Sequence, residues 1–346
     1  MTGEAIGIEI QGPRQAAIAR YPVRDPGEGE VLIESRVSVV SAGTEMLAYR
    51  GELPNDLALD DTIEHMDSSV RYPLRYGYCL VGDVSAGPPD MLGRRVFAFA
   101  PHESLVVTAA AAVVPVPDDI SDEDAVFLAH AETLVNLLQD GRPVAGERVL
   151  VLGQGLVGLL VTSALAATPL TYLAAVDPLE RRRSLALHAG AASAHAPSDM
   201  NTSFVRELLE DHRRYPGFDL VYELSGNPLA ADQAVELCGY SGRVVLGSWY
   251  GTKRVSLNLG GRFHRSRITL QSSQVSTIDP ALSGEFDKGR RFAVAWEMIR
   301  RVRPERYVST RIALEDGAEA YSQLEDNPGE VLTVLLKHPN PARGGA

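Results

Sequence analysis

Three glycines at a fixed spacing carry the clearest chemical signal in the sequence. Gly153, Gly155 and Gly158 follow the apolar segment 149–152, and the whole run is Gly153-Gln154-Gly155-Leu156-Val157-Gly158. Between a strand and a helix, this pattern allows a tight turn, a close approach of backbone to a pyrophosphate and close helix–strand packing. N–H groups at the helix start would then bind the phosphates. The run predicts a dinucleotide site, although the same glycines could serve only to pack a helix on a strand.

An acidic residue follows at a suitable spacing. Asp177 ends the next apolar segment, 173–176, where its carboxylate could accept both hydroxyls of the adenosine ribose. Three arginines, Arg181 to Arg183, complicate the choice of cofactor because guanidinium groups would bind the 2′-phosphate of NADP(H), and we count Arg182 among the candidate contacts. They could equally form an exposed helix face. Since Asp177 would repel a 2′-phosphate, we expect NAD(H) to be preferred over NADP(H).

Further polar residues follow the later apolar segments. Ser225 comes after segment 219–223, and Gly247 and Ser248 come at the end of segment 243–248. Ligands of doubly wound sheets bind at the carboxyl ends of the strands. We therefore expect these three residues near the ribose and nicotinamide, with an ordinary loop role as the alternative.

Composition excludes several classes of protein. The chain has 346 residues, 45% hydrophobic and 23% charged, with a formal net charge of −12 that would repel nucleic acid. No apolar run reaches the roughly 18 residues of a membrane span. The two cysteines cannot form a disulfide framework or a four-cysteine zinc site. Without a signal-like N-terminus, we expect a cytoplasmic protein with a small-molecule substrate.

The periodicity of apolar residues changes along the chain. Short alternating segments such as 30–40 predict a β-rich body over residues 1–125. A helix is expected from Ser121 to about Gln139, and alternating strands and helices then predict a parallel sheet over residues 126–276. Residues 277–346 contain a long amphipathic helix, Arg290 to Arg301, and a final strand, Val331 to Leu336. We expect this last segment to return to the first domain.

The order of these parts, with several motifs, gives a resemblance. The motifs are Ser41-Ala42-Gly43-Thr44-Glu45, Tyr49-Arg50-Gly51, Gly77-Tyr78-Cys79, Gly93-Arg94-Arg95-Val96, the glycine run, and Leu314-Glu315 to Tyr321. Over nearly its whole length the chain resembles the medium-chain dehydrogenase/reductase superfamily, in the branch of sorbitol, threonine and bacteriochlorophyllide dehydrogenases. The resemblance implies an α/β protein with a chaperonin-10-like β-rich catalytic domain and a Rossmann domain.

The residues depart from this family at its catalytic zinc. Zinc enzymes of the family have Cys-Gly-Thr-Asp and Gly-His-Glu, where this chain has Ala42, Tyr78 and Cys79 at the cysteine, histidine and glutamate positions. Glu132 matches the third ligand position of the sorbitol branch. A substitute zinc site could be imagined from Cys79, His102, His130 and Glu132. It is disfavoured because His130 and Glu132 are two positions apart, so on a helix their side chains would point to different faces. We therefore expect no zinc.

The expected reaction is hydride transfer between a nicotinamide and an alcohol or carbonyl substrate. Thr44, which stands at the family's proton-relay position, and Tyr78 are the candidate proton-transfer residues, with Glu132 or His102 as polar support. The absence of zinc ligands also suits the family's quinone and enoyl reductases. A dinucleotide-binding sensor without enzymatic activity is the third alternative.

Two further expectations concern assembly and substrate. The segment Ile268 to Ser272 should be the sixth strand of the parallel sheet, and an apolar edge there would favour a homodimer. Loops such as 55–70 would line the substrate pocket, so the sequence does not identify the substrate.

Overall fold

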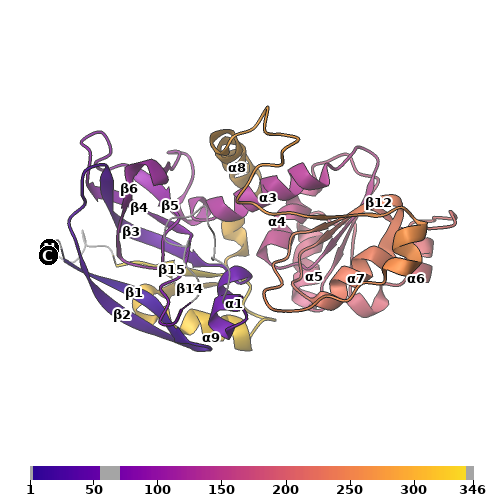
Figure 1. Ribbon diagram of the computed structural model, residues 1–346, viewed down its shortest axis with the longest axis horizontal. Helices are drawn as coiled ribbons and strands as arrows, with labels where there is room; N and C mark the ends of the chain where they lie inside the picture. Colours follow the sequence, from indigo (N-terminus) through magenta and orange to yellow (C-terminus); the bar gives the residue numbers. More distant parts are fainter. Residues whose placement is uncertain (1–2, 55–70, 340–346) are drawn as a thin grey trace. The chain divides into compact units, whose positions relative to one another are not determined.

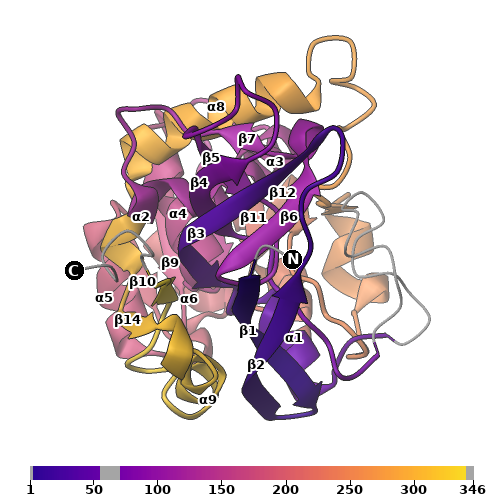
Figure 2. The same cartoon turned by 90° about the vertical axis from the view of Figure 1, so that its left-hand side faces the viewer.

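The chain divides into two compact units. In the computed structural model, one unit comprises residues 1–129 with 303–346, and the other comprises residues 130–302. The structure describes residues 3–54 and 71–339. The loop 55–70, expected to line the substrate pocket, and the tail 340–346 lie outside the described residues. Figures 1 and 2 show the elements of each unit.

The first unit is rich in β structure. Its larger sheet has the order β14-β15-β3-β4-β5-β7, with β6 also paired to β3, and β1 and β2 form a separate hairpin. Its strands are β1 (Gly3–Gly12), β2 (Gln15–Val23), β3 (Glu30–Val40), β4 (Leu80–Ala86), β5 (Arg95–Ala98), β6 (Leu105–Ala109), β7 (Val114–Pro115), β14 (Thr310–Ala313) and β15 (Val334–Lys337). Its helices are α1 (Thr44–Arg50), α2 (Asp122–Ala125) and α9 (Glu319–Asp326).

The C-terminal segment returns to this unit. Strand β15 pairs antiparallel with β3, and β14 pairs parallel with β15. The segment begins at residue 303, whereas the sequence suggested residue 277. The intervening helix α8 (Lys288–Val302) stays with the second unit because it packs on α4 and its Arg291 donates to the carbonyls of Val275 and Thr277.

The second unit is the expected parallel sheet covered by helices. Its strand order is β10-β9-β8-β11-β12-β13, which reverses direction between β8 and β11, as doubly wound sheets do. The strands are β8 (Arg148–Leu152), β9 (Tyr172–Val176), β10 (Ser193–His195), β11 (Phe218–Glu223), β12 (Cys238–Leu246) and β13 (Thr269–Ser272). The helices, besides α8, are α3 (Leu128–Gly141), α4 (Leu156–Leu165), α5 (Glu180–His188), α6 (Thr202–Leu208) and α7 (Pro228–Leu237). The predicted α/β fold class is thus confirmed.

Helices of the second unit form two groups. Helices α4 and α5 pack on each other and on β8, β9 and β10, while α7 packs on β11, β12 and α6 (Figure 1). Right-handed crossovers running in opposite directions from β8 and β11 put these groups on opposite faces of the sheet. The sheet is consequently buried on both faces, which explains why β8 is apolar along nearly its whole length.

One expected helix is two helices. The segment from Ser121 to Gln139 contains α2, capped by the Ser121 hydroxyl at the Asp124 amide, and then α3, which starts at Leu128. The intervening Phe127 amide donates to the Asp124 carbonyl, three residues back, so the helical path tightens and changes direction. The apolar pattern runs through both helices and therefore hid the break.

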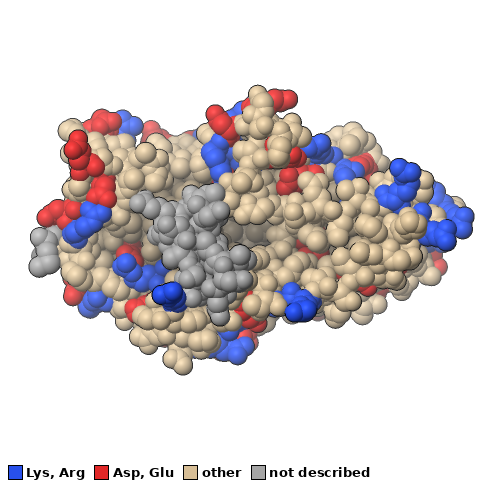
Figure 3. Space-filling model, viewed as in Figure 1, with Lys and Arg blue, Asp and Glu red and all other residues tan. Residues whose placement is uncertain are grey.

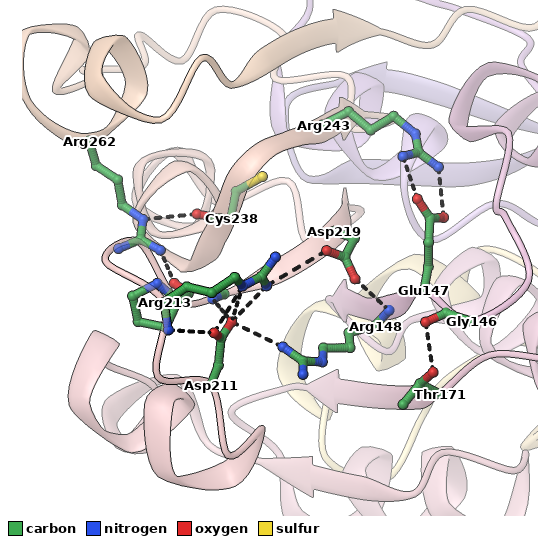
Figure 4. Close-up of polar contacts among 12 residues, drawn as sticks. Gly146, Glu147, Arg148, Thr171, Asp211, Arg213, Asp219, Cys238, Arg243 and Arg262 are labelled. Atoms are coloured by element: carbon green, nitrogen blue, oxygen red, sulfur yellow. Dashed lines mark hydrogen bonds and ion pairs between the residues drawn. The ribbon is translucent and has the colours of Figure 1, made fainter.

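Several ion pairs lie near the amino-terminal ends of the strands of the parallel sheet (Figure 4). The buried Asp211 carboxylate accepts hydrogen bonds from Arg213 at 2.7 Å and Arg148 at 3.0 Å. Burial alone would raise the pKa of Asp211, but the bonds from Arg213 and from backbone amides lower it overall. Nearby, Arg243 bonds both oxygens of Glu147, at 2.7 and 2.8 Å. Asp211 and Glu147 are thus paired with arginines within this unit, and we interpret both carboxylates as structural.

Surface charge is mixed. On the face shown in Figure 3, acidic and basic side chains alternate, with basic ones gathered at the end of the second unit that carries α6. No helix among the described residues is long and apolar enough to cross a membrane.

Strand β13 is the sixth strand and lies at the sheet's edge, as predicted. We propose that two copies pair along this edge. The protein should then run as a dimer in light scattering at micromolar concentration, and Thr269→Lys, which places a charge on the exposed edge, should shift it toward monomer. Thr252→Lys, in an exposed part of a loop, is the control. A monomeric wild-type protein would end the proposal.

Candidate functional site

The glycine run lies where the sequence predicted it, between β8 and α4. Gly153 has φ +88°, and a Cβ there would lie 2.6 Å from the Ser225 Cα. A Cβ on Gly158 would lie 1.9 Å from the Gly153 carbonyl oxygen, whereas nothing lies within 4 Å of one on Gly155. The first and third glycines are therefore required by close backbone contacts, and the second leaves open space for a ligand to approach.

The helix that follows suits an anionic group. Helix α4 begins at Leu156 with Gly155 as its N-cap, and no side chain caps it. Val157 is half-buried, and the Gln154 side chain points inward, bonding to the Val151 carbonyl and the Thr162 hydroxyl. These residues thus fit a pyrophosphate through their backbone, since N–H groups at an uncapped helix start attract negative charge.

Asp177 stabilises the same loop. Its Oδ2 accepts from the Gln154 amide at 2.8 Å and its Oδ1 accepts from the Leu179 amide at 2.9 Å. The carboxylate is therefore fixed in direction, and each oxygen keeps a lone pair for a ribose hydroxyl. Burial lowers the pKa of Arg182, and the charge of Asp177 opposes this effect. The two candidates thus lie within electrostatic reach, while Arg183 donates to the carbonyls of Asp177 and Pro178.

A polar cluster lies at the carboxyl end of β11, where two residues not singled out from the sequence, Glu223 and Tyr250, join the predicted Ser225 and Ser248. The buried Glu223 accepts from the amide and hydroxyl of Ser225, at 2.8 and 2.5 Å, and from the hydroxyl of Tyr250. Ser248 accepts from the Gly226 amide at 2.8 Å. Ser225 and Ser248 do lie at the predicted edge, but their side chains order the loops. A Cβ on Gly247 would meet Leu224 and Leu137, so this glycine permits close packing.

Thr44 and Tyr78 come together in the first unit, as predicted. The Tyr78 hydroxyl donates to the Ser41 hydroxyl at 2.6 Å and also bonds to the Thr44 side chain. Burial raises the pKa of Tyr78, and the neighbouring Cys79 and Glu45 raise it further, although both hydroxyl contacts act in the opposite direction. The phenol is therefore protonated at neutral pH and can act as a proton donor.

Behind Tyr78 lies a buried polar network centred on Glu45. This carboxylate, fully buried, accepts from the Ser41 amide at 2.8 Å, from His102 Nε2 at 2.9 Å and from the Tyr321 hydroxyl at 2.8 Å. His102, which the sequence suggested as polar support, therefore contacts Glu45. The sequence motifs contain both Glu45 and Tyr321 but did not indicate that the two residues are hydrogen-bonded.

The network extends through Ser38 to the return segment. The Ser38 hydroxyl oxygen lies 2.8 Å from His102 Nδ1 and 2.8 Å from His338 Nε2, so it can donate to one ring and accept from the other. All three side chains are buried. Residues separated by up to 300 positions thus share one chain of hydrogen bonds.

Glu132 has a different role from the one expected. It belongs to the second unit, where its buried carboxylate bonds to Lys288 Nζ at 2.7 Å and lies 3.6 Å from Arg291 Nη1. Because this ion pair joins α3 to α8, we interpret Glu132 as a structural residue. Its carboxylate is held by two cations and is not a free acid or base.

The donor set does not fit catalytic zinc. Ala42 has no donor atom and the neutral Tyr78 phenol is a poor ligand, so only Cys79 of these three positions offers a good zinc donor, fewer than the three that a catalytic site needs. Over residues 3–54 and 71–339, no three His, Cys, Asp or Glu side chains are grouped to hold a metal ion.

The buried His338 predicts a pH dependence of stability. Burial, and then repulsion from His102, lower its pKa from 6.5 to about 3 in the folded state. The stabilising effect of keeping this ring neutral is complete above pH 6.5 and is lost as the pH falls toward 3. We expect the free energy of unfolding to fall by up to about 1.4 kcal/mol per pH unit below about pH 6 from this group.

Urea denaturation between pH 4.5 and 7.5, a range chosen around the histidine titration, measures this effect. His338→Gln, which retains a hydrogen-bond donor for Ser38, should flatten the acid limb, and the exposed His188→Gln is the control. An acid limb equally steep in His338→Gln would contradict the assignment.

Comparison with known proteins agrees with this architecture. Residues 157–293 match the family model described as zinc-binding dehydrogenase. The 2-desacetyl-2-hydroxyethyl bacteriochlorophyllide A dehydrogenase of Cereibacter sphaeroides is 26% identical, covering 98% of this chain and 91% of that protein. The L-threonine 3-dehydrogenase of Pyrococcus furiosus is 25% identical, covering 87% and 97%.

Solved structures show the same fold. An alcohol dehydrogenase from Escherichia coli CFT073, solved with NADH, superposes with a TM-score of 0.77 at 18% identity, covering 96% of this chain and 99% of that one. The glycine run, the two-unit fold and these relatives together make the chain similar to the alcohol dehydrogenase-like part of the medium-chain dehydrogenase/reductase superfamily, and they support a nicotinamide-dependent dehydrogenase or reductase.

Proposed function

We propose that this protein transfers hydride between NAD(H) and an alcohol or carbonyl substrate without catalytic zinc. The observation that carries the proposal is the Tyr78 phenol, bonded to Ser41 and Thr44 at the position where zinc enzymes of the family have a histidine ligand. The similarity of the chain to a bacteriochlorophyllide dehydrogenase and a threonine dehydrogenase favours an alcohol and its carbonyl product as the substrate pair.

The residues of the second unit would hold the cofactor. The glycine run and the start of α4 bind the pyrophosphate, Asp177 accepts from the adenosine ribose, and Ser225 and Ser248 order the loops beside the nicotinamide. When bound, the nicotinamide supplies or receives the hydride. The protein's own contribution is to position the reactants and to move one proton.

Tyr78 is the proton donor in the direction of reduction. As the substrate oxygen gains negative charge, the Tyr78 hydroxyl turns from Ser41 to that oxygen, its O–H bond breaks and a new O–H bond forms on the substrate. The remaining phenolate is stabilised by the Ser41 and Thr44 hydroxyls, whose contacts lower the Tyr78 pKa. Water then returns the proton. A neutral phenol thereby replaces the positive charge that zinc would offer the developing oxyanion.

A second candidate is reduction of an activated C=C bond. The lack of a zinc donor set at Ala42, Tyr78 and Cys79 favours it, because such reductases in the superfamily have no catalytic metal. A spectrophotometric panel of secondary alcohols, ketones, quinones and enones, run with both nicotinamides, separates the two. A protein that binds NADH but turns over no member of the panel would instead be a sensor.

Asp177 should select NADH. Its carboxylate can accept a 2′-hydroxyl but repels a 2′-phosphate, so fluorescence titration should give a Kd for NADH at least about tenfold lower than for NADPH. Asp177→Asn should narrow the ratio, while Asp199→Asn, an exposed acidic residue outside the loop, should leave it unchanged. Tighter NADPH binding that disappears in Arg182→Ala would show that the arginine sets the preference.

The phenol should be essential and zinc should not. Tyr78→Phe should lower kcat at least about tenfold with the Kd for NADH unchanged, because the lost interaction belongs to the transition state. The purified protein should contain substoichiometric zinc by elemental analysis. Since the phenol ionises above its ordinary pKa of about 10, the rate of reduction should not decline from this group up to about pH 9.

Tyr72→Phe is the matched control, because this partly buried phenol of the same unit bonds to the Ala48 carbonyl instead. Full activity in Tyr78→Phe would remove the phenol from the mechanism. Stoichiometric zinc whose removal by a chelator abolishes activity would overturn the zinc-free reaction.

A further inference from the structure

The orientation of the Tyr78 phenol depends on Ser41. The Ser41 hydroxyl accepts from the Tyr78 hydroxyl at 2.6 Å, and the Ser41 amide donates to Glu45 Oε1 at 2.8 Å. The Glu45 amide in turn donates to the Ser41 carbonyl at 3.0 Å. Ser41 is therefore held on both sides of its Cα by Glu45, which fixes where its hydroxyl can receive the phenol.

A second contact reaches Tyr78 through its backbone. Gly77 has φ +136°, and a Cβ there would lie 2.9 Å from His102 Nε2 and 3.1 Å from the His102 amide nitrogen. The imidazole thus packs directly on the residue before Tyr78. The same nitrogen, Nε2, bonds to Glu45 Oε2 at 2.9 Å. The Glu45–His102 pair consequently constrains Tyr78 both at its hydroxyl, through Ser41, and at its backbone, through Gly77.

We propose that Ser41, Glu45 and His102 are positioning residues for the Tyr78 phenol, acting through it and without touching the substrate. The inference rests on the proposed function. The Glu45 carboxylate is suited to this role because three donors hold it: an amide of its own turn, an imidazole, and the Tyr321 hydroxyl from α9. The carboxylate and its three donors cannot shift independently of one another. Because one of these donors is the Ser41 amide, the Ser41 hydroxyl keeps the phenol oxygen at one place relative to Thr44.

A double-mutant cycle tests the inference. With the panel substrate of highest kcat/KM, Ser41→Ala should lower kcat about fivefold, the value of one neutral hydrogen bond, with the Kd for NADH unchanged. In the Tyr78→Phe background, the same change should have no further effect, because Ser41 then has no phenol to hold. Ser41→Thr, which retains the hydroxyl, should restore most of the activity.

Ser35→Ala is the control. Ser35, on β3, is also buried, and its hydroxyl donates to the Glu103 carbonyl at 2.6 Å instead of contacting Tyr78 or Glu45. Tyr321→Phe removes one donor to Glu45 while preserving the ring that stacks on Tyr49, and it should lower kcat in the wild type but not in Tyr78→Phe. This variant tests the role of Glu45 without a substitution of the buried carboxylate itself.

The outcomes separate the two proposals. Activity lost in Tyr78→Phe, with Ser41→Ala either unchanged in rate or additive with it, overturns the positioning role and leaves the phenol as the proton donor. Full activity in Tyr78→Phe overturns both. A fivefold loss in Ser41→Ala that vanishes in the Tyr78→Phe background supports both.

Discussion

The fully buried carboxylate of Glu45 is the constraint on which the first unit depends. An ionised group removed from water costs several kcal/mol unless it is paired and hydrogen-bonded, and removal of one partner leaves that cost exposed. Here the three donors are the backbone amide of Ser41, just before α1, the imidazole of His102 and the hydroxyl of Tyr321 in α9. The return segment thus supplies one of the donors that this carboxylate needs, which couples the N-terminal and C-terminal segments in one polar network.

The second unit solves a related problem with backbone groups. Its cofactor loop is fixed by the contacts that exclude a Cβ at Gly153 and Gly158, and by the two amides that Asp177 accepts from. A loop held in this way loses little conformational freedom when a dinucleotide binds. Asp177 thus serves both as a structural acceptor and as the group expected to face the ribose, and the same pair of hydrogen bonds aims it for the second role.

Local sequence patterns foretold the parts of this structure that local interactions determine. Helix α7, one of the helices that the alternating pattern predicts over residues 126–276, begins at Pro228 because Asn227 caps it and the first helical position needs no amide hydrogen bond. The break between α2 and α3 left no trace in the apolar pattern. The hydrogen bonds of the Glu45 network could not be foreseen either. Tyr321 reaches Glu45, and His338 reaches Ser38, only through tertiary folding. The ion pair of Glu132 could not be foreseen for the same reason, because Lys288 lies 156 residues away.

The Glu45 network also bears on the zinc-free reaction that we propose. In the zinc enzymes that this chain resembles, the acidic residue at the position of Glu45 orients the metal's histidine, which is Tyr78 here. The carboxylate has not been left unpaired, because His102 supplies an imidazole from another segment and occupies Oε2 together with Tyr321. Its second oxygen holds the Ser41 amide. The acidic residue has therefore exchanged the task of orienting a metal ligand for that of fixing the hydroxyl that receives a phenol, and the lone pairs needed to orient a ligand histidine are already engaged.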